Sequence, residues 1–305
     1  MAGCASAARS VMRALVLSDI HSNIDALEAV MAAAPPYDVV WNLGDLVGYN
    51  AAPNAVLERV QQLRDVSVRG NHDRACCGLY DAENFNSIAL AAVRWTQRQL
   101  NEGSVEWLRA LPKGPIYISA EERTAGPHST RRTLAPGRLS TPVVRDGEST
   151  FGRDDKPDYK SNPCEIACVH GSLRDEDQYL ASIADAEEQP IGPDCRITFF
   201  GHTHIQGGFA ANADGEWMKL RPMYSKDDAA ESYALDLRGP MRYLINPGSV
   251  GQPRDRDWRA AFALYDDEAD RVTYYRVPYD VRLAQMRIQR AGLPEMLASR
   301  LRVGR

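Results

Sequence analysis

The strongest constraint on this chain is a set of short apolar runs, each followed directly by acidic, histidine or asparagine side chains. The first run covers residues 13–17 and leads into Ser18-Asp19-Ile20-His21. Runs of this length and composition are typical of buried strands. In an open α/β sheet, ligands bind beyond the carboxyl ends of the strands, so Asp19 and His21 can point into one crevice. An isolated Asp-x-His, however, is more often a helix cap beside a surface histidine.

The same arrangement recurs four more times. Predicted strands over residues 38–43, 66–68, 165–169 and 196–200 lead into Gly44-Asp45, Gly70-Asn71-His72-Asp73, His170-Gly171 and Gly201-His202-Thr203-His204. Five of the six histidines lie in these motifs; the sixth, His128, has no motif around it and is expected to be an ordinary surface residue. Coincidence can explain one or two such groups but not five in one structural context. We therefore expect one shared site at the strand ends, formed by Asp19, His21, Asp45, Asn71, His72, His170, His202 and His204.

The spacing of apolar residues predicts an α/β fold. Helices are expected over residues 24–34 and 53–64, and their alternation with strands indicates βαβ units and a largely parallel first sheet. Two amphipathic helices follow over residues 85–100 and 104–111, with Trp95 and Trp107 as core anchors. Later strands, near residues 205–210, 233–237, 242–245, 261–265 and 272–277, have no helices between them. This pattern predicts a mixed or antiparallel second sheet packed on the first.

We expect a single domain over residues 12–305, with a helical tail from about residue 281. Residues 121–163 are rich in Ser, Thr, Pro, Gly and Arg and lack apolar periodicity, which predicts either a disordered insertion or a substrate lid. Either Met1 or Met12 is compatible with the native start, because the first predicted strand begins just after Met12.

Composition excludes several other classes. An apolar fraction of 44% and a charged fraction of 25% are those of an ordinary globular protein, and a net charge of -5 argues against general nucleic-acid binding. The six cysteines form no Cys-x-x-Cys pair, so they are expected to be reduced thiols, with Cys168 and Cys195 in the core. No run approaches the ~18 apolar residues of a membrane span, and we find no signal peptide. We therefore expect a cytoplasmic protein with no membrane partner.

Four histidines, two aspartates and one asparagine indicate a metal site. Mixed imidazole and carboxylate ligands suit Mn, Fe, Co, Ni or Zn better than Ca or Mg. Seven ligands are too many for one ion but suit two, and a carboxylate can bridge them. Two ions roughly 3.5–4 Å apart can polarise a phosphoryl group and generate a nucleophile at neutral pH.

In this order the motifs resemble those of the calcineurin-like metallophosphoesterases, over about residues 14–277 outside the insertion. Asn246-Pro247-Gly248-Ser249 makes the chain most similar to the small bacterial and archaeal phosphodiesterases. The resemblance implies a four-layer αββα sandwich of two mixed sheets and two divalent ions, Mn being expected first. It also implies the ligands: Asp19, His21 and His204 for one ion, Asn71, His170 and His202 for the other, and Asp45 as the bridge. His72 would stabilise the transition state or protonate the leaving oxygen, and Asp73 would either orient His72 or be an exposed acid at a helix start.

One departure from the family bears on the substrate. The protein phosphatases of the family continue the second motif as Gly-Asp-x-x-Asp-Arg-Gly, whereas residues 44–50 here lack the second acid and the arginine. This difference favours a nucleotide or another small phosphodiester. Arg254 and Arg256 either bind a second phosphate or are solvated surface arginines.

The leading hypothesis is a two-metal phosphodiesterase in which a metal-bridging hydroxide attacks phosphorus in line. The alternatives are a phosphomonoesterase, a dinucleoside-polyphosphate hydrolase and a non-catalytic scaffold.

Overall fold

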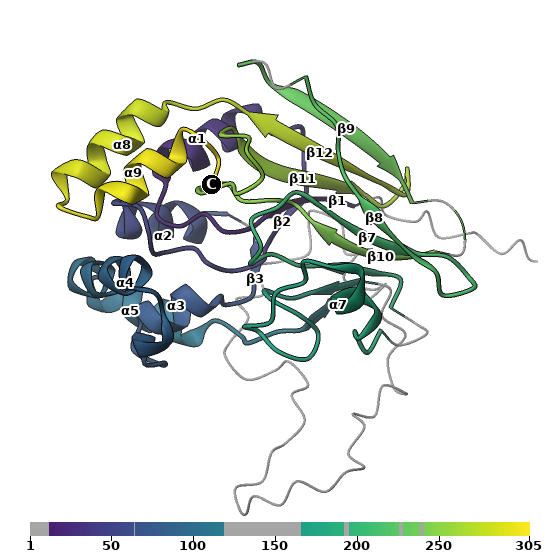
Figure 1. Cartoon of the computed structure of the whole chain (residues 1–305), viewed down its shortest axis with the longest axis horizontal. Helices are drawn as coiled ribbons and strands as arrows, with labels where there is room; N and C mark the ends of the chain where they lie inside the picture. Colours follow the sequence, from purple (N-terminus) through teal and green to yellow (C-terminus); the bar gives the residue numbers. More distant parts are fainter. Residues whose placement is uncertain are drawn as a thin grey trace, which may run out of the picture.

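Two six-stranded sheets pack face to face, and helices cover their outer faces (Figure 1). The computed structural model describes residues 12–305 except 64, 119–165, 192–194, 226–227, 238 and 240, so the predicted insertion at 121–163 and His128 lie outside the described residues. The predicted four-layer α/β sandwich is confirmed. No helix in the described ranges is both long and apolar enough to cross a membrane.

The first sheet has the order β3-β2-β1-β11-β12-β9. Its parallel half consists of β1 (Arg13–Leu17), β2 (Val39–Asn42) and β3 (Asp65–Ser67). Its antiparallel half consists of β11 (Ala260–Asp266), β12 (Arg271–Val277) and β9 (Glu231–Asp236). The prediction of a largely parallel first sheet is therefore wrong for half of its strands. The reason is that C-terminal strands return to pair with β1, with Leu15 opposite Leu264.

The second sheet has the order β4-β5-β6-β10-β7-β8 and is mixed, as predicted. Its membership differs from the prediction, because the strands expected in it near residues 233–237, 261–265 and 272–277 lie in the first sheet. Its strands are β4 (Ile116–Ile118), β5 (Ile166–Cys168), β6 (Ile197–Phe199), β10 (Arg242–Asn246), β7 (Gly207–Ala211) and β8 (Trp217–Leu220). The three central strands β5, β6 and β10 run parallel, and the outer ones are antiparallel. Strand β8 was not predicted, because its largely exposed residues lack the apolar alternation of a half-buried strand.

Several helices begin where a polar side chain caps them. Asn23 accepts a hydrogen bond from the backbone of Ala26 at the start of α1 (Ile24–Ala33), and Asp280 caps α8 (Val281–Arg290) in the same way. The other helices are α2 (Pro53–Gln61), α3 (Asn71–Cys76), α4 (Ser87–Gln99), α5 (Glu102–Ala110), α7 (Ile183–Glu187) and α9 (Glu295–Leu301). The short helix α7 was not predicted, and α3 was expected only as a helix start at Asp73. Trp95 and Trp107 pack against the helical core, as predicted, although each is only partly buried.

Alternation along the strands divides the core into layers. In β1, Leu15 and Leu17 pack under the helices, whereas Ala14 and Val16 face the space between the sheets. That inner layer also contains Trp41 and Phe199, whose rings lie 5.5 Å apart. Cys168 and Cys195 are buried as predicted. This inner layer fixes the two sheets relative to each other. The loops that follow their parallel strands therefore meet at one edge.

Candidate metal centre

The five motif loops converge at this edge. Backbone hydrogen bonds tie the first loop to the second, from Asp19 N to Gly44 O (3.0 Å) and from His21 N to Asp45 O (2.9 Å). The loops of the second sheet are joined in the same way, from Gly201 N to His170 O (2.8 Å). All eight predicted site residues are buried, with at most 9% of any of them exposed. The structure thus brings together the whole set expected from the sequence.

A first group of ligand atoms consists of Asp19, His21, Asp45 and His204. The Nε2 atoms of His21 and His204 lie 3.1 Å apart, and Asp19 Oδ1 lies 3.3 Å from His204 Nε2. Oδ2 of Asp19 accepts hydrogen bonds from Ser18 Oγ and His202 N, whereas the buried Oδ1 has no hydrogen-bond partner in the described part of the chain. Asp19 is therefore held by one oxygen and presents the other to the two imidazoles.

A second group consists of Asp45, His170 and His202, with Asn71 beside it. His170 Nε2 lies 3.1 Å from His202 Nδ1 and 3.2 Å from Asn71 Oδ1. Asn71 is the first residue of α3, so a helix start fixes its position.

Asp45 lies between the two groups. Its Oδ2 is 3.5 Å from His21 Nε2 and 3.4 Å from His170 Nε2, whereas its Oδ1 accepts the backbone N–H of His72 at 2.8 Å. Gly70 permits this close approach of loops, because a Cβ at that position would lie 2.0 Å from Asp45 Oδ1. The free oxygen of Asp45 is thus in contact with both groups, as a bridging ligand requires.

The hydrogen bonds of the four histidines show that each group suits a cation. His21, His170 and His204 place Nδ1 on the backbone carbonyls of Val47, Leu43 and Gln252 at 2.6–3.0 Å, and His202 places Nε2 on Asp177 O at 3.1 Å. A neutral ring that donates one N–H to a carbonyl keeps a lone pair on its other nitrogen. If all four rings are neutral, two lone pairs face each other at 3.1 Å in each group, an arrangement that a positive charge between them stabilises. The residues present fit two metal ions.

Electrostatics supports the same conclusion. Burial, with a contribution from the charge of Asp45, raises the pKa of Asp19 to about 7. Burial alone would lower the pKa of His170, but the charge of Asp45 and its hydrogen bond outweigh burial and raise this pKa to about 10. Burial, together with the charge of His170, lowers the pKa of His202 to about 3. The raised pKa of His170 and the lowered pKa of His202 favour one proton between these two rings, so a proton and a metal ion would compete for this position.

His72 lies at the edge of the centre and is not part of either ligand group. Its ring is 4.9 Å from the rings of His21 and Phe85 and 4.4 Å from that of Tyr49. Its buried Nδ1 has no hydrogen-bond partner among the described residues. Burial lowers the pKa of His72 to about 4, so the ring is neutral at pH 7. This position beside the ligands suits a group that contacts a bound phosphate.

Asp73 lies in the first turn of α3, as one of the two expectations has it, but it is buried and not exposed. Its oxygens accept backbone N–H groups from Val47 (3.1 Å) and Gly70 (3.0 Å). The hydrogen bonds of Asp73 that the structure describes are therefore to the backbone and not to His72. Asp73 joins the Asp45 loop to the start of α3, and it is better described as a positioning residue.

The two arginines predicted to bind substrate differ. Arg254 donates its backbone N–H to His204 O at 3.1 Å, and its guanidinium contacts Tyr49 Oη at 3.4 Å. Arg256 is exposed in a left-handed turn, and its backbone N–H bonds to Gly304 O near the C-terminus. Arg254 thus joins the centre, and the described contacts of Arg256 lie toward the C-terminal residues.

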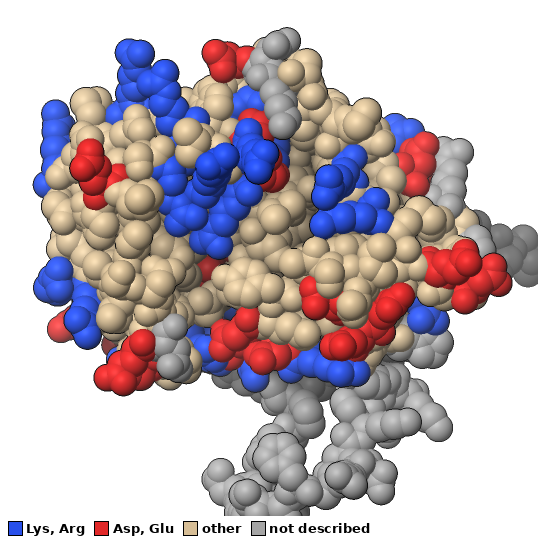
Figure 2. All heavy atoms as spheres, in the orientation of Figure 1, with Lys and Arg blue, Asp and Glu red and all other residues tan. Residues whose placement is uncertain are grey.

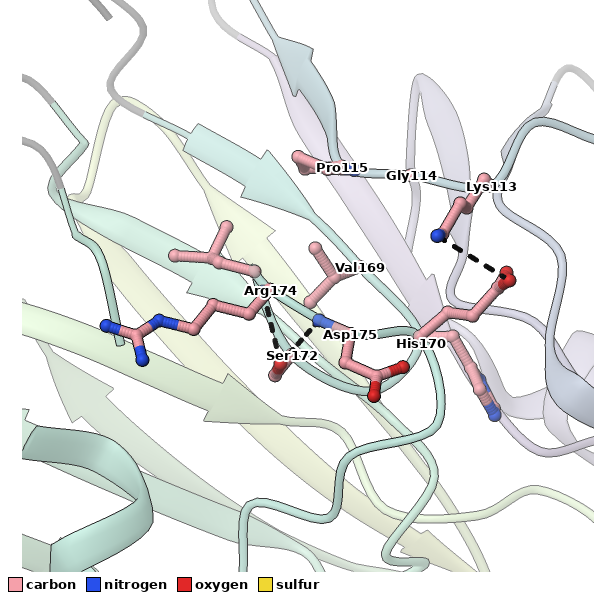
Figure 3. A pocket seen from close by; sticks show the side chains of 10 residues that line it. Lys113, Gly114, Pro115, Val169, His170, Ser172, Arg174 and Asp175 are labelled. Atoms are coloured by element: carbon pink, nitrogen blue, oxygen red, sulfur yellow. Dashed lines mark hydrogen bonds and ion pairs between the residues drawn. The ribbon is translucent and has the colours of Figure 1, made fainter. Parts of the chain in front are cut away.

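Glu176 was not predicted to belong to the site, yet its hydrogen bonds join two of the ligand loops. It receives two hydrogen bonds from Arg69 at 3.1 Å and one from Arg74 at 2.6 Å, and Lys113 lies 4.0 Å away. A hollow of about 200 Å³ opens here, with His170 at its edge (Figure 3). Because Arg69 and Arg74 flank Asn71, Glu176 ties the His170 loop to α3. No motif surrounds Glu176, so only the folded structure reveals this role.

A second residue missed from the sequence is Tyr179. Its ring stacks on that of His202 at 3.9 Å and is 51% exposed. Together with Tyr49 near His21 (4.6 Å), it provides an aromatic wall around the ligands.

Comparison with known proteins identifies the family. Residues 12–206 match the model of the calcineurin-like phosphoesterases. An uncharacterized protein of Methanocaldococcus jannaschii is 30% identical over 293 residues, covering 95% of this chain and 97% of its own. A metallophosphoesterase from Sphaerobacter thermophilus, solved by crystallography, is 31% identical with a TM-score of 0.71, covering 97% of this chain and 100% of its own.

A hypothetical protein from Pyrococcus horikoshii has the same fold at 19% identity, with a TM-score of 0.64 and coverage of 96% of this chain and 98% of its own. The family hydrolyses phosphate esters and depends on divalent metals, which agrees with the two ligand groups. The chain belongs to the calcineurin-like phosphoesterase family.

Proposed function

We propose that this protein is a two-metal phosphodiesterase acting on nucleotides or other small phosphodiesters. The observation that carries the proposal is the pair of facing imidazole lone pairs on either side of Asp45 Oδ2. Two divalent ions held there would polarise the phosphoryl oxygens and supply a nucleophile at neutral pH. Mn is the ion expected first, with Fe, Co, Ni and Zn as alternatives for the same ligands.

The protein itself would supply preorganisation. One oxygen of Asp19 and one of Asp45 are already held by hydrogen bonds, and a backbone carbonyl orients each of the four histidines. Ligand atoms that are fixed in this way need no rearrangement when charge develops on the phosphate. His72, whose ring lies beside that of the ligand His21, would donate an N–H hydrogen bond to a phosphoryl or leaving-group oxygen.

The preference for a diester is supported by the residues next to Asp45. Tyr49 stands where the protein phosphatases of the family have the arginine of their second motif, and it packs against His72. A neutral phenol suits the single negative charge of a diester better than the double charge of a monoester. The monoesterase is the alternative that the same ligands allow.

Hydrolysis of bis(p-nitrophenyl) phosphate and p-nitrophenyl phosphate by the Mn-loaded protein tests the proposal. We expect faster turnover of the diester, about two ions per chain by elemental analysis, and a fall of about 100-fold or more in kcat for Asp45→Asn and His202→Ala. Asp214→Asn, an exposed aspartate in a turn, is the matched control and should not change either rate. Parent-like rates in Asp45→Asn, or faster turnover of the monoester, would contradict the proposal.

A further inference from the structure

Tyr179 is an exposed aromatic residue in direct contact with a candidate metal ligand. Its ring lies 3.9 Å from the ring of His202, and the angle between the two ring planes is 27°. His202 thus covers one face of the tyrosine ring, yet 51% of Tyr179 is exposed. The opposite face of the ring is therefore open to solvent.

Tyr49, the aromatic residue beside the first ligand group, offers no such face. Its ring lies 4.6 Å from the ring of His21 and 4.4 Å from that of His72, and only 6% of Tyr49 is exposed. Among the described Phe, Tyr and Trp residues with a ring contact to a candidate ligand, Tyr179 alone is exposed. A flat group of a substrate can therefore stack on Tyr179 but not on Tyr49.

The loop that carries Tyr179 is held in place on both sides. Before it, the carbonyl of Asp177 accepts a hydrogen bond from His202 Nε2 at 3.1 Å, and Glu176 is held by the two arginines of the α3 loop. After it, Leu180 is buried in a core cluster of the second sheet. A ring that is already fixed loses little conformational freedom when another group stacks on it, so binding costs less entropy.

The surface around Tyr179 is acidic. Residues 174–188 contain six Asp or Glu residues and one Arg. Figure 2 shows Asp and Glu side chains gathered over α7, which follows Tyr179 in the chain, whereas Lys and Arg side chains gather near the chain end marked C in Figure 1. These carboxylates would repel an anion bound on Tyr179. A neutral planar group therefore fits this position better than a further phosphate.

We propose that Tyr179 is a stacking platform for a nucleobase, so that the preferred substrates are nucleotides rather than other small phosphodiesters. This inference rests on the proposed function, because the reacting phosphate would lie at the ligand atoms next to His202. In a nucleotide the sugar separates the base from the phosphate, and here the ring of Tyr179 separates the base position from His202. Stacking on a ring face tolerates different bases, so the platform selects for a base rather than for one sequence letter.

Kinetics on a matched pair of diesters tests the platform. The probes are deoxyadenosine 5′-(trifluoroethyl phosphate) and its base-free analogue, in which a hydrogen atom replaces adenine. Both release trifluoroethanol, which fluorine NMR measures, and adenine is the only aromatic group in either probe. We expect the Mn-loaded protein to show a kcat/KM about tenfold or more higher on the adenine probe.

Three variants show whether this preference comes from the ring of Tyr179. Tyr179→Leu should bring the ratio of the two kcat/KM values near one, whereas Tyr179→Phe keeps a ring and should keep most of the ratio. Tyr233→Leu changes another exposed tyrosine, on the outer strand β9, and should have the ratio of the parent. The ratio separates stacking from any effect of Tyr179 on His202, because a disturbed metal centre slows the hydrolysis of both probes equally.

A ratio near one in the parent, an unchanged ratio in Tyr179→Leu, or a lost ratio in Tyr179→Phe would overturn the platform. Binding distinguishes this failure from failure of the proposed function. If the protein hydrolyses neither probe with any metal, the phosphodiesterase proposal fails, but calorimetry still compares deoxyadenosine 5′-monophosphate with base-free deoxyribose 5′-phosphate. We expect the parent and Tyr233→Leu to bind the nucleotide about tenfold or more tightly, and Tyr179→Leu to bind both equally. Equal affinities in the parent would overturn the platform independently of catalysis.

Discussion

The position of His72 depends on the absence of a side chain at Gly48, and this makes Gly48→Ala an informative perturbation. Gly48 has a φ of +94°, and a Cβ there would lie 2.7 Å from His72 Nδ1 and 3.2 Å from its Cγ. The ring cannot move away freely, because Tyr49 lies 4.4 Å and Phe85 4.9 Å from it on other sides. An added methyl group must therefore displace His72 or the loop.

Two effects should lower the free energy of unfolding in Gly48→Ala. A left-handed conformation destabilises alanine by about 1–2 kcal/mol, and forcing a methyl group into a packed site adds about 1–3 kcal/mol. Gly215→Ala separates the two, because Gly215 has a φ of +83° and nothing lies within 4 Å of its Cβ position. Urea unfolding of the metal-loaded proteins should show a loss of about 1–2 kcal/mol for Gly215→Ala and about 2–5 kcal/mol for Gly48→Ala.

Gly48→Ala should affect kcat more strongly than it affects the free energy of unfolding. If His72 contacts the phosphate, its displacement in Gly48→Ala should lower kcat on the diester about 100-fold with two ions still bound, whereas Gly215→Ala should be fully active. In the background of His72→Ala the clash disappears, so Gly48→Ala should then have little further effect on rate and a smaller effect on stability. Parent-like kcat in Gly48→Ala, or additive losses in the double variant, would refute the role assigned to His72.

Three further outcomes are expected. His21→Ala should lower the metal content from about two ions per chain to about one, since the other site keeps its private ligands; an unchanged content would count against the assignment. Glu176→Ala leaves two arginines without their carboxylate and should lower the free energy of unfolding by about 2–4 kcal/mol, whereas Glu187→Ala, at an exposed position, should not. Burial alone would raise the pKa of Asp257, but hydrogen bonds from Arg259 outweigh burial and lower it, so the stability that Asp257 provides is present above pH 3.8 and lost below it. The difference in free energy of unfolding between the parent and Asp257→Asn should therefore become smaller below that pH. A difference that does not depend on pH would contradict the role assigned to Asp257.

The ligand set could be predicted from the sequence because each motif is local. Asp19 and His21, or His202 and His204, are two residues apart and follow an apolar run, so residue type and position both indicate the chemistry. The layered architecture was predictable for the same reason, since most strands, unlike β8, carry their own apolar signal.

Strand pairing and supporting contacts could not be predicted, because they join residues far apart in the chain. β11 pairs with β1 across more than half of the sequence, and no feature of either strand specifies that partner. Glu176 contributes to the site through a loop that carries no motif. Asp73 shows a related limit: its residue type suggested a catalytic partner, whereas its hydrogen bonds to Val47 N and Gly70 N depend on how two loops cross.

The backbone conformation of the site loops explains why contacts between the loops are needed to support them. Of the nine non-glycine residues with positive φ in the described chain, seven lie in the site loops: Asp19, His21, Ser22, Asp45, Tyr49, His202 and His204. Each such residue is strained by about 1–3 kcal/mol, and the conformation persists only where the surroundings impose it. Here the imposing contacts are backbone bonds between loops, such as Ser22 N to Leu46 O at 2.8 Å, together with the Asp73 and Glu176 clamps. Strain concentrated at the candidate ligands indicates that contacts between loops impose their geometry, so substitution of a supporting residue such as Asp73 or Glu176 should also disturb the ligands.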